Sequence, residues 1–219
     1  MTTTTESSFK QYLIIAALLF SGPASAIVIN DGDSFSVDWF VSDSALSGDL
    51  SATSTWSVDF LSSTQIQIDV SITNTTTLTG GLTNADITTL GFGVTPNATA
   101  SFVTNGEGAV FDMLSAGSGP QQTFPGGFKG IDVCVFADGC AGGDTKNGLH
   151  AGDTDTFSLL LTGSFGSSAE LLFFPIKFQT SQGSYEPGGD VTVPEPSIVV
   201  LLGIGLAIIG FARRQVIQA

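Results

Sequence analysis

Apolar and polar residues alternate along much of the chain between residues 27 and 193. The clearest case is segment 65–72, in which every second residue is Ile or Val and the residues between are polar. A period of two is typical of an antiparallel strand with one buried face and one solvated face. The same alternation predicts strands over 34–41 and 156–162.

Further strands are predicted where short apolar segments lie between turn-forming residues such as Gly80-Gly81 and Asn105-Gly106. Their ranges are 55–61, 87–94, 100–104, 109–114, 131–136 and 170–180. Pro175 lies within the last range, which indicates an edge strand or a bulge there. No part of 27–193 has a sustained period of 3.6 residues, so we expect residues 27–182 to form an all-β domain, an antiparallel β-sandwich that is jelly-roll-like.

The N-terminal end has a different pattern, with Lys10 before an apolar segment over 12–20 and small residues at Ala24 and Ala26. This order is typical of a secretory signal peptide that is cleaved after Ala26. The apolar segment is too short to cross about 30 Å of hydrocarbon as a helix that rises 1.5 Å per residue. We therefore expect a signal helix within residues 1–26.

The C-terminal end contains an uncharged apolar segment of 15 residues, 198–212, followed directly by Arg213 and Arg214. As a helix it would measure roughly 22 Å, a marginal length for a membrane span. The positive-inside rule places the two arginines, as a basic stop, in the cytoplasm and the large domain outside. The sequence thus predicts a single transmembrane helix over 198–212.

Pro194, Glu195 and Pro196 precede this segment. Each proline fixes φ and lacks a backbone donor, and a residue before proline avoids the helical region. We expect an extended, solvated segment just outside the bilayer, a shape that a protease active site accepts. A proline-containing spacer before an ordinary anchor is the alternative, and 183–193 reads as a linker that leads to the signal.

The residues Val193, Pro194, Glu195, Pro196 and Ser197, with the apolar helix and the arginine pair, resemble the PEP-CTERM sorting signal of bacterial exported proteins. The resemblance covers only 194–219 and the residue before it, and the tail after the arginines is longer than usual. It implies recognition by an exosortase, a membrane-embedded cysteine protease thought to remove the tail and pass the protein to the cell surface or extracellular matrix. Such proteins typically occur in Gram-negative bacteria that make exopolysaccharide and biofilm.

The chain carries 20 acidic and 6 basic residues, which gives a formal net charge of −14. This charge disfavours nucleic acid and anionic lipid surfaces as partners and is compatible with cations, basic surfaces or neutral glycans. The 17 Phe and 2 Trp residues supply enough apolar area for the middle of the chain to fold.

Cys134 and Cys140 are the only cysteines. Outside the cytoplasm two cysteines this close predict a disulfide, which would contribute about 2.4 kcal/mol on the chain-entropy estimate for a seven-residue loop. A metal site and free thiols are the alternatives. Segments 134–148 and 174–180 also resemble the cistern subfamily of PEP-CTERM proteins, which carries a cysteine pair; that resemblance implies no established activity.

The chain offers little sign of catalysis. His150 is the only histidine, and no Gly-x-Ser-x-Gly motif marks a nucleophile, so the sequence predicts no catalytic residues and no enzyme. A pair of catalytic carboxylates for glycoside hydrolysis remains an open alternative, because the sequence does not give the distance between carboxylates. Two glycosylation sequons, at Asn74 and Asn97, are further candidates for modification.

Aspartates in glycine-rich segments are weak candidates for a calcium site, and no other cofactor is expected. They are Asp31, Asp33, Asp153 and Asp155. Their spacing matches neither an EF-hand nor a calcium-binding repeat, and Asp is also a common turn residue.

We therefore expect an exported structural or adhesive protein, held at the inner membrane as a precursor, processed by an exosortase and deployed at the surface or in the biofilm matrix. Extracellular polysaccharide is the possible ligand, and nucleic acid is not a partner. One alternative is an uncleaved single-pass membrane protein with an external β-sandwich binding domain. A secreted hydrolase is the other.

Overall fold

The computed structural model describes residues 26–116, 124–142 and 145–194. Within these ranges the chain forms β-strands and one short 3₁₀ helix, η1 (Thr145–Asn147). The strands are β1 (Ala26–Ile29), β2 (Ser34–Val41), β3 (Leu50–Ser62), β4 (Gln65–Asn74), β5 (Ala85–Thr95), β6 (Ala98–Phe102), β7 (Met113–Ala116), β8 (Val133–Phe136), β9 (Thr154–Gly163), β10 (Ala169–Leu172), β11 (Ile176–Thr180), β12 (Gly183–Tyr185) and β13 (Asp190–Thr192). None of the described residues belongs to a helix with the length and hydrophobicity of a membrane span.

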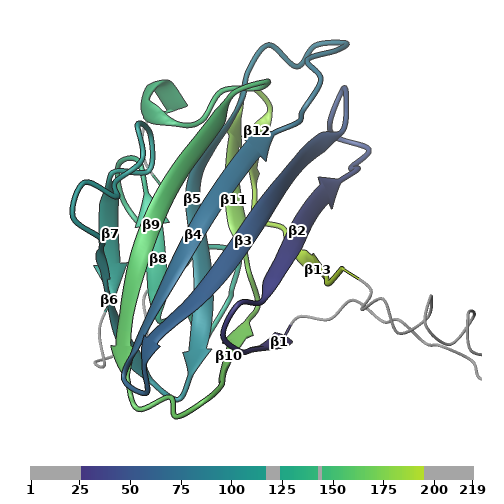
Figure 1. Cartoon of the computed structure of the whole chain (residues 1–219). Helices are drawn as coiled ribbons and strands as arrows, with labels where there is room; N and C mark the ends of the chain where they lie inside the picture. Colours follow the sequence, from purple (N-terminus) through teal and green to yellow (C-terminus); the bar gives the residue numbers. More distant parts are fainter. Residues whose placement is uncertain (1–25, 117–123, 143–144, 195–219) are drawn as a thin grey trace, which may run out of the picture.

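The strands form two antiparallel sheets, which lie one in front of the other in Figure 1. One sheet has six strands in the order β13-β2-β3-β4-β9-β6. The other has seven: β1 pairs with β10, both β10 and β11 pair with β5, β12 pairs with β11, and β8 pairs with β5 and with β7. The expectation of an all-β chain with two antiparallel sheets is therefore confirmed.

The main core lies between the two sheets and consists of the inward residues of the alternating strands. Trp56 of β3 lies at its centre, with its ring centroid 5.5 Å from that of Phe92 in the facing sheet and 5.4 Å from that of Phe174. Both contacts are edge-to-face, the arrangement that aromatic pairs prefer. Trp39 Nε1 also donates a 2.7 Å hydrogen bond to the Phe174 carbonyl, so the sheets are joined by polar as well as apolar contacts.

The outward face of the seven-stranded sheet is covered by the segment around residues 124–140. Phe124, Ile131 and Cys134 form a second, smaller cluster there. A Cβ at Gly91 of β5 would lie 2.8 Å from the Phe124 ring, so the cover packs directly on the strand backbone. This explains why β5 is buried along nearly its whole length, without the alternation seen in β4.

Segment 170–180, expected as one strand, forms two strands, β10 and β11. Between them Phe173 and Phe174 have positive φ values of 74° and 46°, and Pro175 follows. Positive φ is uncommon for bulky residues, so the backbone turns here and does not continue the ladder. The proline thus marks a break between strands and not a bulge within one.

Segment 183–193, expected as a linker, contains β12 and β13. β13 pairs with β2 in the register Val191↔Val37. The preceding Gly189 donates its N–H to the Phe174 carbonyl at 3.0 Å, and a Cβ there would lie 2.3 Å from Val37 Cγ1. The chain is therefore packed against the domain as far as Thr192.

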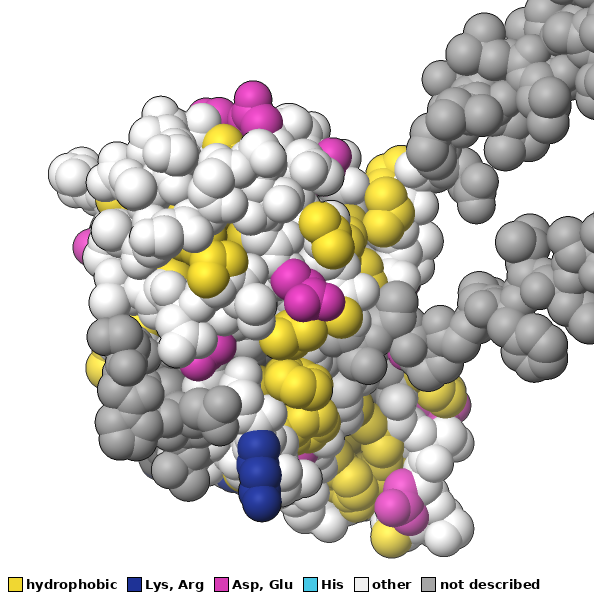
Figure 2. Space-filling view, turned by 90° about the horizontal axis from the view of Figure 1, so that it is seen from below, with side chains coloured by type: hydrophobic (Ala, Val, Ile, Leu, Met, Phe, Trp, Pro, Cys, Tyr) yellow, Lys and Arg dark blue, Asp and Glu magenta, His cyan; other side chains and the backbone are white. Residues whose placement is uncertain are grey.

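Charged and apolar side chains are unevenly spread over the surface. Figure 2, which views the molecule from below, shows apolar side chains gathered at this end and acidic side chains spread around them. Lys and Arg are seen at one place in that view, in keeping with the excess of acidic residues in the sequence.

Candidate functional site

A groove of about 470 Å³, here called the outer groove, lies on the outward face of the six-stranded sheet and is lined mainly by polar residues. Its floor is formed by β2, β3, β4 and β9, and its wall by the loop between β6 and β7. The lining residues are Ser34, Thr55, Trp56, Ser57, Asp69, Val70, Ser71, Asn105, Gly106, Glu107, Thr156, Phe157 and Ser158.

Strand register arranges the outward groups of the groove in two rows across the sheet. One row runs through Ser34, Ser57, Asp69 and Ser158, which are successive cross-strand partners. The other runs through Thr55, Ser71 and Thr156. Since neighbouring strands lie about 4.8 Å apart, a row over four strands is about 14 Å long. The alternation that buries Ile and Val on one face therefore places hydroxyls and a carboxylate on the other.

Asp69 is the one acidic residue in the rows, and its carboxylate is hydrogen-bonded within the sheet surface. It accepts a hydrogen bond from the Ser158 hydroxyl at 2.5 Å and from Gln67 Nε2 at 3.1 Å. These contacts hold the carboxylate in a defined position between β4 and β9.

The wall of the groove is fixed to the edge of β9 by backbone hydrogen bonds. Val103 donates to the Ser158 carbonyl at 2.9 Å, and Ser158 donates to the Gly106 carbonyl at 2.7 Å. Asn105 has a φ of 58°, a conformation that Asn tolerates better than most residues. A Cβ at Gly106 would lie 3.0 Å from the Ser158 carbonyl, so the close approach favours glycine.

Asp155 holds the continuation of this loop. Its carboxylate, in a residue only 5% exposed, accepts hydrogen bonds from the backbone N–H groups of Ala109, Val110 and Phe111 at 2.8, 2.9 and 2.8 Å. The strand expected over 109–114 is therefore wrong for its first part, because these amides donate to a side chain and not to a neighbouring strand. β7 begins only at Met113.

Two of the other calcium candidates, Asp31 and Asp33, also have partners within the protein. Asp31 Oδ1 accepts a hydrogen bond from the Phe60 N–H at 2.9 Å, and Asp33 Oδ2 accepts one from the Asn30 N–H at 2.7 Å. In the part of the chain that the structure describes, no three His, Cys, Asp or Glu side chains are grouped for a metal ion. The structure thus does not bring Asp31 and Asp33 together with Asp153 and Asp155, and calcium remains a prediction from sequence.

Cys134 and Cys140 form the disulfide expected from the sequence, with an S–S distance of 2.08 Å. The loop between them is bound to the sheet beneath: Thr89 Oγ1 donates to the Gly139 carbonyl at 3.2 Å. The Ala141 carbonyl, just after the loop, accepts a hydrogen bond from Lys177 Nζ at 2.9 Å. The disulfide therefore closes a segment that already contacts β5 and β11.

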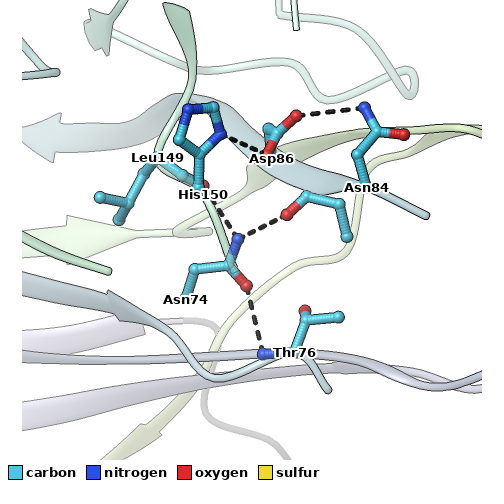
Figure 3. A network of polar contacts seen from close by, with 7 residues as sticks. Asn74, Thr76, Asn84, Asp86, Leu149 and His150 are labelled. Atoms are coloured by element: carbon cyan, nitrogen blue, oxygen red, sulfur yellow. Dashed lines mark hydrogen bonds and ion pairs between the residues drawn. The ribbon is translucent and has the colours of Figure 1, made fainter. Parts of the chain in front are cut away.

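A polar network lies at the end of β4 and the start of β5 (Figure 3). The fully buried Asn74 donates to the carbonyls of Ala85 and Leu149 at 2.7 and 2.9 Å and accepts from the Thr76 N–H at 3.2 Å. An amide in this position is not accessible for glycosylation of the folded protein. The second sequon residue, Asn97, is exposed in the turn between β5 and β6.

His150 belongs to the same network through Asp86. Its Nδ1 lies 2.8 Å from Asp86 Oδ1; the histidine side chain is 58% exposed and the aspartate side chain 5%. The hydrogen bond to Asp86 raises the pKa of His150 above its ordinary value, helped by the charges of Asp86 and Asp153 and opposed by partial desolvation. The contact ties the loop after η1 to β5.

The sorting motif begins where β13 ends. Val193 is 53% exposed and Pro194 is also exposed, so both lie on the surface at the edge of the six-stranded sheet. Glu195, Pro196, Ser197, Arg213, Arg214 and the expected membrane helix 198–212 lie outside the described residues. The expected signal helix with Ala24 does too, whereas Ala26 is the first residue of β1.

Comparison with known proteins agrees with the interpretation of the C-terminal end. Residues 192–215 match the family model of the PEP-CTERM protein-sorting motif, a range that includes Val193–Ser197, the apolar segment and both arginines. No curated protein and no solved structure matches the chain. The match does not determine a subfamily, so the cistern resemblance stays a prediction. The chain therefore carries a PEP-CTERM protein-sorting motif at residues 192–215.

Proposed function

We propose that the chain is an exported protein that an exosortase processes near Pro194–Pro196 and that is then deployed at the cell surface or in the extracellular matrix. The observation that carries this proposal is the sorting-motif match over residues 192–215. In the precursor, the apolar segment 198–212 would hold the protein at the inner membrane with Arg213 and Arg214 in the cytoplasm.

The position of the motif relative to the fold supports processing. β13 ends at Thr192, and the next two residues are exposed and outside any strand. A protease needs an extended, accessible segment, which the prolines favour. Because β13 pairs with β2 before the motif begins, cleavage after Thr192 would leave the domain's own pairing intact.

For the domain itself we propose a structural or adhesive role without catalysis, in a β-sandwich with jelly-roll-like character. The two layered sheets and the disulfide suit a protein that works outside the cytoplasm. The acidic charge supports a partner that is neutral or basic, for which extracellular polysaccharide is our candidate.

The test is to replace Pro194, Glu195 and Pro196 together by alanine in the producing host. We expect the wild-type chain outside the inner membrane in shortened form, and the variant at full length in the membrane fraction. A matched control replaces three exposed residues of the β4–β5 connection, Thr77, Leu78 and Thr79, by alanine and should be processed like the wild type. Equal processing of the two variants would contradict the proposal and support an ordinary membrane anchor.

A further inference from the structure

The sorting motif accounts for where the protein goes, but it does not account for the outer groove. At about 470 Å³, the groove has the size of clefts that bind small molecules or segments of a polymer, roughly 300–1,000 Å³. It lies on the sheet face that the 124–140 segment does not cover.

The groove offers many hydrogen-bonding groups that the protein does not use itself. The hydroxyls of Ser57, Ser71 and Thr156 have no hydrogen-bond partner among the residues that the structure describes, and they are exposed or half-buried. Each hydroxyl is both donor and acceptor, and the carboxamide of Asn105 on the wall adds both functions. A ligand with many hydroxyls could replace the water on these groups one for one.

The same surface is poorly suited to a peptide. Its apolar lining residues, Trp56, Val70 and Phe157, are floor residues that are buried in the core, so they form no pocket for an apolar anchor. The backbone groups of β3, β4 and β9 are already paired with neighbouring strands, so no added strand can pair with this face. Side-chain hydroxyls are what remain for recognition.

The charge of the groove further restricts the class of ligand that it can bind. The groove is lined by the carboxylates of Asp69 and Glu107, and by no Lys, Arg or His among the described residues. Asp38 and Asp59 are exposed on the same sheet face outside the groove. A uronic acid polymer or a nucleic acid would be repelled, whereas a neutral or amino-bearing sugar would not.

The groove is also formed before any ligand arrives. The backbone bonds between the wall and Ser158 fix one side, and the three amides bound by Asp155 fix the segment that follows. A site that is already ordered loses little conformational entropy on binding.

We propose that the outer groove binds a glycan chain without acidic groups, laid across β2, β3, β4 and β9 and against the loop that carries Asn105 and Glu107. This inference rests on the proposed function in that it names the ligand class of the same exported domain. The two can fail separately, because binding is measured on the purified chain and sorting in cell fractions.

The test uses the full chain purified in detergent and titration calorimetry with cellohexaose, a chitosan hexamer and an alginate oligosaccharide. We expect binding of cellohexaose or the chitosan hexamer and none of alginate. Ser71→Tyr should fill the groove and weaken binding by about tenfold or more. Thr162→Tyr places the same side chain on the outward face of β9, away from the groove, and should bind like the wild type.

A second pair of variants separates the groove from general charge attraction. Glu107→Gln and Asp59→Asn each remove one negative charge from this face, but only Glu107 lines the groove. We expect weaker chitosan binding for Glu107→Gln alone. Binding of none of the non-acidic glycans, binding of alginate as tight as theirs, or equal losses in both members of either pair would overturn the inference.

Discussion

Replacement of Asp155 by asparagine tests how the wall of the outer groove is held. Asp155 Oδ1 accepts one backbone hydrogen bond, from Ala109, and Oδ2 accepts two, from Val110 and Phe111. Asparagine has nearly the same shape but only one acceptor oxygen. At least one of the three amides would therefore face an NH₂ group, which is itself a donor.

The cost follows from the burial of the site. A hydrogen bond to a charged group is worth about 1.5–3 kcal/mol, and a buried donor left without a partner costs about 1–3 kcal/mol. Because the Asp155 residue is only 5% exposed, little water can compensate. We expect Asp155→Asn to lower the free energy of unfolding by about 2–4 kcal/mol.

The assay is urea unfolding of the protein purified from the host, followed by the fluorescence of the buried Trp39 and Trp56. Asp153→Asn is the matched control. It also removes one negative charge, but from an exposed residue two positions before Asp155. A surface change of this kind should alter stability by less than about 0.5 kcal/mol. Equal effects of the two variants would refute the argument, because net charge and not the three amides would then decide stability.

Two other predictions concern the disulfide and the histidine. Reduction of Cys134–Cys140 should lower the free energy of unfolding by about 2.4 kcal/mol on the chain-entropy estimate for the seven-residue loop, measured by urea unfolding with and without reductant; an unchanged midpoint would contradict it. The pKa of His150 is raised from 6.5 in the folded protein, so its contact with Asp86 should stabilise the fold fully below about pH 6.5 and lose that contribution as pH rises through the folded pKa. Unfolding free energies between pH 5 and 8, compared with His150→Gln, test this; the same pH profile for both proteins would show that the pair does not contribute.

Strands with one buried face could be predicted from sequence because their buried positions are apolar and their exposed positions are polar, in strict alternation. The range 34–41 is confirmed as β2, and the range 65–72 lies within β4. The fully buried strand β5 was found without alternation, from its turn-flanked apolar and β-branched residues.

Errors arose where backbone groups have partners that the sequence does not reveal. The amides of 109–111 donate to Asp155, which is 44 or more residues away in the chain, and this contact decides against a strand. β1, β12 and β13 are only three or four residues long, too short for a period to show. The pairing of β1 with β10 and of β13 with β2 joins distant parts of the chain, whereas β12 pairs with β11 through a two-residue turn.

The two candidate sites also differ in how far the sequence could predict them. The sorting motif is a local string of residues, so the sequence was enough to find it, and the family match confirms it. The outer groove exists only through strand register and a loop that folds onto β9. The outward Ser, Thr and Asp positions of 65–72 and 156–162 were the one available signal, and they do not reveal that Ser71 and Thr156 are neighbours.

The most direct test of the account is the intact mass of the protein from its native host, measured separately in membrane and extracellular fractions. We predict a species outside the inner membrane that begins at Ile27 and ends near Pro194–Pro196, about 2 Da lighter than its reduced form because of the disulfide. A single membrane-bound species that still carries Arg213 and Arg214 would contradict sorting and processing at the motif.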